Sequence, residues 1–142
     1  MPRVHEIIHN RELFSVDERD TVADVVRRMA ELHVGAILVL GNETLRGVFS
    51  ERDLLRRVVL DRLDPERTPV SQVMSTALAT IDELASVEDA MAMMQAHNCR
   101  HLPVMRGSRA VGFLSMRDLM NFELAQKTEE LHHMRAYIHG SA

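Results

Sequence analysis

A seven-residue motif that combines a strand end with a helix start occurs twice in the chain. The copies are Gly47-Val48-Phe49-Ser50-Glu51-Arg52-Asp53 and Gly112-Phe113-Leu114-Ser115-Met116-Arg117-Asp118, and 65 positions separate them. The free N–H groups at a helix start attract an anion beside the serine hydroxyl. The aspartate, one turn further on, can accept hydrogen bonds from vicinal hydroxyls and would repel a phosphate. The motif therefore predicts a sugar at the aspartate, a phosphate near the serine, and an adenine between aliphatic residues of adjacent strands.

Helix capping is the alternative explanation for the same residues. In Ser-x-x-Asp the serine caps the helix and the acid favours the positive end of its dipole. Thr21-x-x-Asp24 and Ser86-x-x-Asp89 have this form with no implied ligand. The duplication with its leading glycine thus indicates two related halves, and it leaves both binding and capping open.

The elements around the motif also repeat, without a gap, from residues 13–54 to residues 78–119. Apolar and capping patterns predict a strand, a helix, two strands and a helix in each half. The predicted strands of the second half are 78–81, 101–105 and 110–114, after a short leader at 70–74. Pro103 predicts that one side of its strand lacks a ladder partner, because proline has no N–H to donate.

The repeat suggests a division into two units and a tail. We expect a first repeat at 1–63, a linker at 64–69, a second repeat at 70–125 and a C-terminal helical extension at 126–142. Units of this size bury little core alone, so we expect them to pack as a pseudo-two-fold pair. The last helix is expected to run from Met116 to about His139, with apolar positions that pack on a partner or on its own domain.

Composition limits the function classes. The 142 residues carry a formal net charge of −4, which argues against general nucleic-acid binding. With the single Cys99, no internal disulfide can form, and the chain fits a reducing compartment. No apolar run is long enough to span a membrane and the N-terminus lacks a secretory apolar region, so we expect a cytoplasmic protein without membrane contact.

Both halves resemble CBS (cystathionine-β-synthase-type) domains, and the chain resembles a stand-alone bacterial tandem pair, or Bateman module. The resemblance covers about residues 4–122. It rests on Gly-apolar-apolar-Ser-x-Arg-Asp-Leu in both copies, on the helix opening Thr/Ser-Val-x-Asp, and on His101-Leu102-Pro103-Val104. It implies an α/β fold of two β-α-β-β-α repeats with two clefts between the sheets. It also implies a regulatory role, homodimers shaped as a flat disc, an unidentified regulated partner, and a regulatory ligand among AMP, ADP, ATP, NAD(H) and S-adenosylmethionine.

The resemblance also implies which residues meet the ligand. Asp53 and Asp118 would hold ribose hydroxyls, with serines and arginines of the motif at the ribose and phosphate. The full expected set is Ser15, Ser50, Arg52, Asp53, Thr80, Arg100, His101, Pro103, Ser115, Arg117 and Asp118. Because Gly35-Ala36 stands where the second half has Arg100-His101, we expect unequal clefts, with the second the better candidate.

Other functions remain to be weighed against a nucleotide sensor. His5-Glu6-Ile7-Ile8-His9 matches the zinc-peptidase pattern H-E-x-x-H, but nothing else in the sequence supports a peptidase, and we predict no metal site. No pairing of nucleophile and base suggests an enzyme. The main alternative is a ligand-free dimeric scaffold, in which the repeats serve only for interaction.

Overall fold

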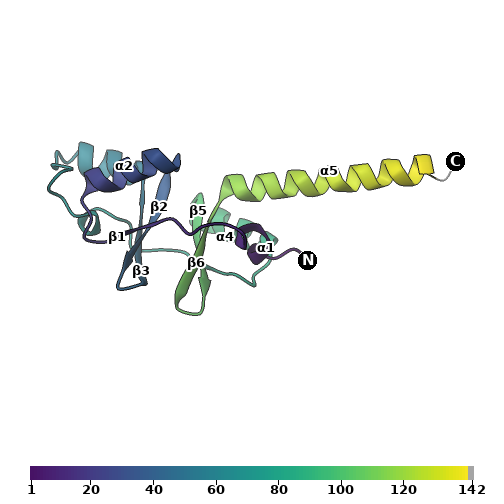
Figure 1. Ribbon diagram of the computed structural model, residues 1–142, viewed down its shortest axis with the longest axis horizontal. Coiled ribbons are helices and arrows are strands. Elements are labelled where there is room, and N and C mark those ends of the chain that lie inside the picture. The colour runs from purple at the N-terminus through teal and green to yellow at the C-terminus, as the bar shows by residue number, and fades with distance from the viewer. Residues whose placement is uncertain (141–142) are drawn as a thin grey trace.

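The computed structural model describes residues 1–140 and contains two similar α/β halves followed by a long helix (Figure 1). The first half comprises α1 (Val4–Ile8), β1 (Ser15–Asp17), α2 (Val22–Leu32), β2 (Ala36–Gly41), β3 (Thr44–Ser50), α3 (Glu51–Asp53) and the π-helix η1 (Leu54–Val59). The second comprises the 3-10 helix η2 (Val70–Gln72), β4 (Ile81–Asp82), α4 (Val87–His97), β5 (His101–Arg106), β6 (Arg109–Ser115) and α5 (Met116–Gly140).

The two sheets have the same topology and the same register. Their strand orders are β1-β2-β3 and β4-β5-β6, each with one parallel and one antiparallel pair. Ala36 pairs with Ser50 in the first sheet, as His101 pairs with Ser115 in the second. Each central strand also has a register shift at the equivalent point, after Val39 and after Val104. The tandem repeat predicted from the sequence is confirmed at the level of individual residue pairs.

The short leading segments are exchanged between the halves. Val4 and Ile8 of α1 are buried in the core around β4-β5-β6, which we call the second core. Val70 and Val73, at the start of the second half, are buried in the core around β1-β2-β3, the first core. Backbone hydrogen bonds fix both placements, at 2.9 Å from Val4 N to Ala85 O and 2.8 Å from Val70 N to Asp20 O. Each core therefore contains residues from both halves of the chain.

Three local features of the fold differ from expectation or refine it. The first strand of the second half is Ile81–Asp82, shorter and later than the predicted 78–81. The helix after Ser50 continues beyond α3 as the π-helix η1. Pro103 pairs with Phe113 on β6, whereas β4 meets β5 only at Val104 and Met105, so proline has no partner on that side, as predicted.

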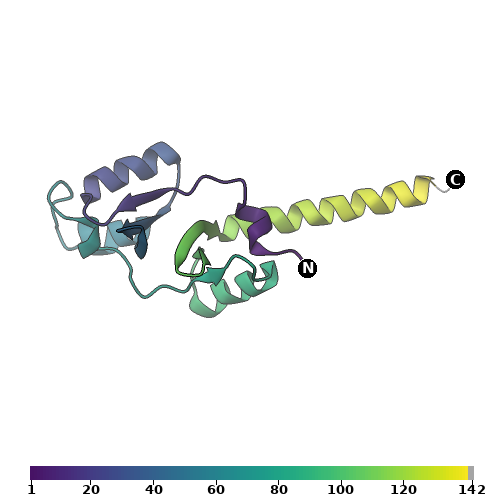
Figure 2. The same cartoon turned by 60° about the horizontal axis from the view of Figure 1, so that its bottom comes forward.

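Helix α5 begins in the second core and then leaves it. Leu119 is fully buried there and Phe122 packs against the same cluster. Beyond these residues the helix projects away from both halves, as two views show (Figures 1 and 2). Its described end at Gly140 agrees with the predicted long helix, while residues 141–142 of the expected extension lie outside the described residues. No described helix is both long and apolar enough to cross a membrane.

Candidate functional site

The second copy of the motif forms the start of α5 as a reciprocal cap. Asp118 Oδ2 accepts a hydrogen bond from Ser115 N at 2.8 Å, and Ser115 Oγ accepts one from Asp118 N at 3.0 Å. The Arg100 carbonyl accepts the next free N–H, from Met116, at 2.8 Å. The capping interpretation is therefore correct, and capping leaves further acceptor positions on the carboxylate for another donor.

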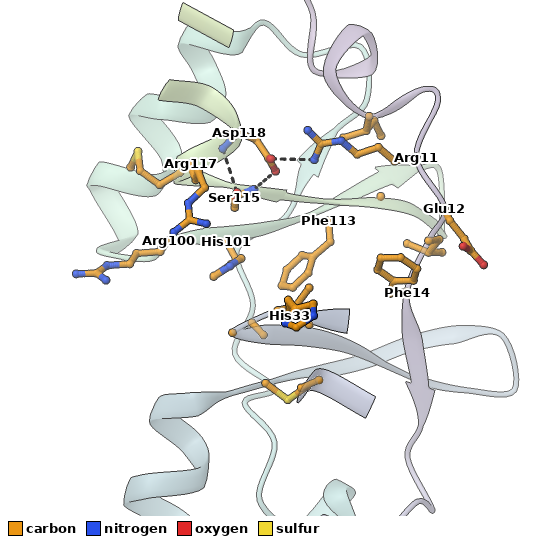
Figure 3. A pocket seen from close by; sticks show the side chains of 18 of the residues that line it. Arg11, Glu12, Phe14, His33, Arg100, His101, Phe113, Ser115, Arg117 and Asp118 are labelled. Atoms are coloured by element: carbon orange, nitrogen blue, oxygen red, sulfur yellow. Dashed lines mark hydrogen bonds and ion pairs between the residues drawn. The ribbon is translucent and has the colours of Figure 1, made fainter. Parts of the chain in front are cut away.

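A cavity of about 1230 Å³ opens beside this helix start, between the two halves. It is large enough for a nucleotide-sized molecule by the usual range of ligand pockets. Residues of both halves line it: Arg11, Phe14, His33 and Glu51 come from the first, and Arg100, His101, Phe113, Ser115, Arg117 and Asp118 from the second. Figure 3 shows Arg117 and His101 close to Ser115, Arg100 beside them with its side chain extending outward, and the rings of Phe14 and Phe113 directed into the cavity.

Asp118 is held ionised at the edge of this cavity. Its Oδ1 lies 2.9 Å from Arg11 Nη1, and its side chain keeps 17% of its surface exposed. Burial alone would raise the pKa of Asp118, but the hydrogen bonds with Arg11 and Ser115 outweigh burial and hold that pKa below its usual value. The carboxylate is thus a fixed anionic acceptor at neutral pH.

His101 is a second titratable residue that lines the same cavity. Its ring stacks on Phe113 with centroids 5.1 Å apart. Burial lowers the pKa of His101, Asp118 and Glu51 act to raise it, and Arg100 lowers it further, with a lowered pKa as the result. Beside Arg100 and Arg117, this imidazole can donate a hydrogen bond to an anion. It can also take up a proton when an anion binds.

In the first copy of the motif, both oxygens of the aspartate carboxylate already have partners within the chain. Asp53 Oδ2 accepts hydrogen bonds from Ser50 N and Ser50 Oγ, both at 3.0 Å. Its Oδ1 accepts one from Ser75 Oγ at 3.0 Å and lies 3.7 Å from Arg57 Nε. The segment that supplies Ser75 also pairs with β3, through Val48 N to Ser75 O at 3.0 Å and the reverse bond at 2.9 Å. Asp53 is buried and its acceptor positions are occupied.

The predicted site residues therefore fall into two groups. Arg100, His101, Ser115, Arg117 and Asp118 line the large cavity. The other six do not: Ser50 and Asp53 belong to the closed first motif, Arg52 is exposed on α3, Thr80 is exposed before β4, Pro103 is buried in β5, and Ser15 lines a separate hollow of about 300 Å³.

The cavity also contains residues that the sequence did not single out. Arg11 and Phe14 lie in the connection between α1 and β1, and His33 ends α2. Arg11 has no counterpart in the repeat, since the equivalent position is Thr76. The sequence signal that could have identified Arg11 is a charged residue at a position where the two halves differ.

The H-E-x-x-H segment forms α1 and serves the second core. His5 and His9 stack with ring centroids 5.6 Å apart, and His9 Nδ1 lies 3.0 Å from the Glu6 carbonyl oxygen. Among the described residues, no group of three or more His, Cys, Asp or Glu side chains is placed to hold a metal ion.

Comparison with known proteins assigns the family. The family model for the CBS domain matches residues 4–60 and again 70–125. CBS domain-containing protein YhcV of Bacillus subtilis is 33% identical over 108 residues, covering 76% of each chain. Mitochondrial CBS domain-containing protein CBSX3 of Arabidopsis thaliana is 32% identical over 126 residues, and the match spans 85% of this chain but 61% of the plant protein.

The solved structures agree with this assignment. A putative signal-transduction protein with CBS domains from Burkholderia ambifaria superposes with a TM-score of 0.81 at 31% identity, covering 87% of this chain and 94% of the other. PAE2072 of Pyrobaculum aerophilum, a CBS domain protein crystallised with AMP, gives a TM-score of 0.75 at 30% identity, over 87% and 98% of the two chains. The chain belongs to the CBS domain family, as a tandem pair of CBS domains.

Proposed function

We propose that this CBS pair is a sensor of adenosyl nucleotides, with the ligand in the cavity beside Asp118. The observation that carries the proposal is the joining of three kinds of group in one cavity: a carboxylate, a cationic cluster and aromatic rings. CBS pairs commonly regulate other proteins by binding such ligands, and the relative from Pyrobaculum aerophilum holds AMP. The proposed role is binding and regulation, without catalysis by this chain.

Each group has a chemical role in the proposed complex. Asp118 accepts hydrogen bonds from the ribose hydroxyls through acceptor positions that Arg11 and Ser115 leave open. Arg100 and Arg117 contact the phosphate, with His101 and the N–H groups at the start of α5 as further donors. Phe14 and Phe113 offer flat apolar surfaces to the base.

Calorimetric titration with AMP, ADP, ATP, NAD(H) and S-adenosylmethionine tests this function. We expect heat from at least one of them and a raised unfolding temperature at saturation. Asp118→Asn should weaken that ligand by about tenfold or more, because a charge-assisted hydrogen bond is lost. Asp89→Asn is the matched control: Asp89 sits in the same Ser-x-x-Asp cap on α4 and does not line the cavity.

The ligand-free scaffold is the competing function, and the same titration separates the two. A scaffold predicts no heat and no thermal shift with any of the five ligands. It also predicts that Asp118→Asn and Asp89→Asn behave alike. Under either function we propose that the chain works as a homodimer in the cytoplasm, and that a regulated protein reads its state.

A further inference from the structure

The projecting part of α5 carries a stripe of exposed apolar side chains. Leu124, Leu131 and Met134 are 66%, 52% and 60% exposed, respectively. Ile138, at the far end of the stripe, is similarly exposed, as is Met120 at the near end, where the side chain also borders the large cavity. Single exposed apolar residues are common on protein surfaces, but an aligned series on one helix indicates an interaction face.

The spacing of the stripe is that of a coiled coil. The positions are 120, 124, 127, 131, 134 and 138, which alternate steps of four and three residues. Leu124, Leu131 and Ile138 occupy one heptad position, and Met120, Lys127 and Met134 the other. A stripe that follows a 3.5-residue period matches a second helix wound around α5, rather than a broad globular surface.

The stripe is also distinct from the face of α5 that packs on its own domain. Beyond its first residue, Met116, α5 packs on the second core through Leu119 and Phe122. At about 100° per residue, the stripe is centred about 130° around the helix from these two residues. If two α5 helices met along this stripe, the CBS domains of each chain would lie on the outer side of its own helix. The projecting segment in Figures 1 and 2 stands away from both halves, which leaves room for another helix beside it.

We propose that this stripe is the interface with a second copy of the chain, as a parallel, in-register, two-stranded coiled coil. Charge selects the orientation. In a parallel pair Glu130, which flanks the stripe on one side, faces Arg135 of the partner subunit, which flanks it on the other, five residues further on. An antiparallel pair in which all six stripe positions meet a stripe position of the other helix would instead place Glu130 against Glu130 of the partner subunit.

The middle layer fixes the register. Lys127 is the one polar residue in the stripe, and any shift by a heptad would bury it against an apolar residue. In register, the two lysines share one layer and extend their charged ends to solvent, where Glu123 on the same helix lies four residues before each of them. An anionic membrane surface is a poor alternative, since Glu123, Glu129 and Glu130 outnumber the two cations Lys127 and Arg135 of this segment.

The first test is the mass of the full chain in solution. Leu131→Glu should halve the mass seen by sedimentation equilibrium, or raise the dissociation constant by about tenfold or more, because it places two charges in an apolar layer. Ala136→Glu adds the same charge on the opposite, exposed face and should change nothing. An equal mass for wild type and Leu131→Glu overturns the proposal, whether that mass is a monomer or an oligomer.

A charge exchange tests the orientation. Glu130→Arg should weaken the dimer, and adding Arg135→Glu should restore it. Within one helix these residues are five positions apart, about 140° around the axis, so rescue cannot come from a contact inside one chain. Failure of the double variant to recover at least the wild-type mass distribution contradicts the parallel arrangement.

Disulfide trapping gives the register directly. In a Cys99→Ser background, Leu131→Cys should form a covalent dimer with oxidised glutathione as the oxidant, whereas Glu129→Cys on the outer face should not. A mixture of Leu124→Cys and Met134→Cys chains that cross-links better than Leu131→Cys would show an antiparallel pair and overturn the proposal. Leu131, Glu130 and Arg135 do not line the cavity, so the outcome is independent of the proposed nucleotide binding.

Discussion

The two aspartates of the duplicated motif differ in how much of their hydrogen-bonding capacity is already used. Asp53 receives three hydrogen bonds and an ion pair and is 8% exposed at its side chain. Asp118 receives one bond from Ser115 and one from Arg11 and borders a large cavity. The sequence predicted unequal clefts from the Arg100-His101 difference. The physical cause of the closed first motif is instead Ser75, which backbone hydrogen bonds with Val48 of β3 hold in place.

The pH dependence of stability should report the state of His101. Its pKa in the folded protein is lowered mainly by burial, so the unfolded chain binds more protons as the pH falls through about 6.5. This contribution to stability is present above that pH and is lost below it. We expect the unfolding temperature of the wild type to fall more between pH 7.5 and 5.5 than that of His101→Gln.

An exposed histidine provides the control for this pH effect. His132→Gln removes a titratable side chain from the solvent-exposed part of α5 and should leave the wild-type pH profile unchanged. Parallel profiles for His101→Gln and the wild type would contradict the assigned cause.

The glycines of the two motifs are expected to tolerate alanine differently. A Cβ at Gly47 would lie 2.7 Å from both the Ser75 carbonyl oxygen and Met74 Sδ. At Gly112 the closest atom, at 2.6 Å, is the Cδ1 at the end of the Ile8 side chain. A backbone oxygen held in a bridge to β3 cannot move as a side-chain end can, so Gly47→Ala should cost about 1–3 kcal/mol and Gly112→Ala less. Urea unfolding of both variants measures the difference, and an equal or reversed order would contradict it.

At the scale of elements, the exchange of leading segments was not predictable from the repeat. Both α1 and η2 precede their halves in the chain, and internal similarity places each with the half that follows it. In the structure α1 does contact the second core, and η2 the first, because the pairs Val4–Ala85 and Val70–Asp20 satisfy backbone groups across the halves. Periodicity reports which face of an element is apolar, and it does not report which core receives that face.

This exchange makes Val4 a core residue of the other half. Val4 is fully buried, and Val4→Ala should lower the free energy of unfolding by about 2 kcal/mol through lost burial and a residual cavity. Val73→Ala, in the segment that enters the first core, should have a similar effect. Val59→Ala is the control, since Val59 is largely exposed and should shift stability by no more than about 0.5 kcal/mol. Denaturant titration would contradict the exchange if Val4→Ala matched this control.

At the scale of the whole molecule, the fold was predictable and the candidate site only in part. The repeat fixes the strand and helix order because each predicted element recurs at one spacing. Five of the predicted residues do line one cavity, since β5, β6 and the start of α5 are adjacent in the second half. Arg11, Phe14 and His33 reach it only through the packing of one half on the other, and no local pattern encodes that packing.

The intertwined cores predict that the two repeats unfold together. Each core contains a segment from the opposite half, and β3 also lies against β6, so loss of one core exposes apolar surface of the other. Scanning calorimetry should therefore show a single transition with equal calorimetric and van't Hoff enthalpies. Val4→Ala should move this transition to lower temperature without splitting it, although its side chain contacts only the second core.

A nucleotide at a hundred times its dissociation constant should increase the free energy of unfolding by about 2.7 kcal/mol and move the same single transition to higher temperature, because both halves line the cavity. Two resolved transitions, with only one moved by Val4→Ala or by ligand, would mean that the repeats are independent units.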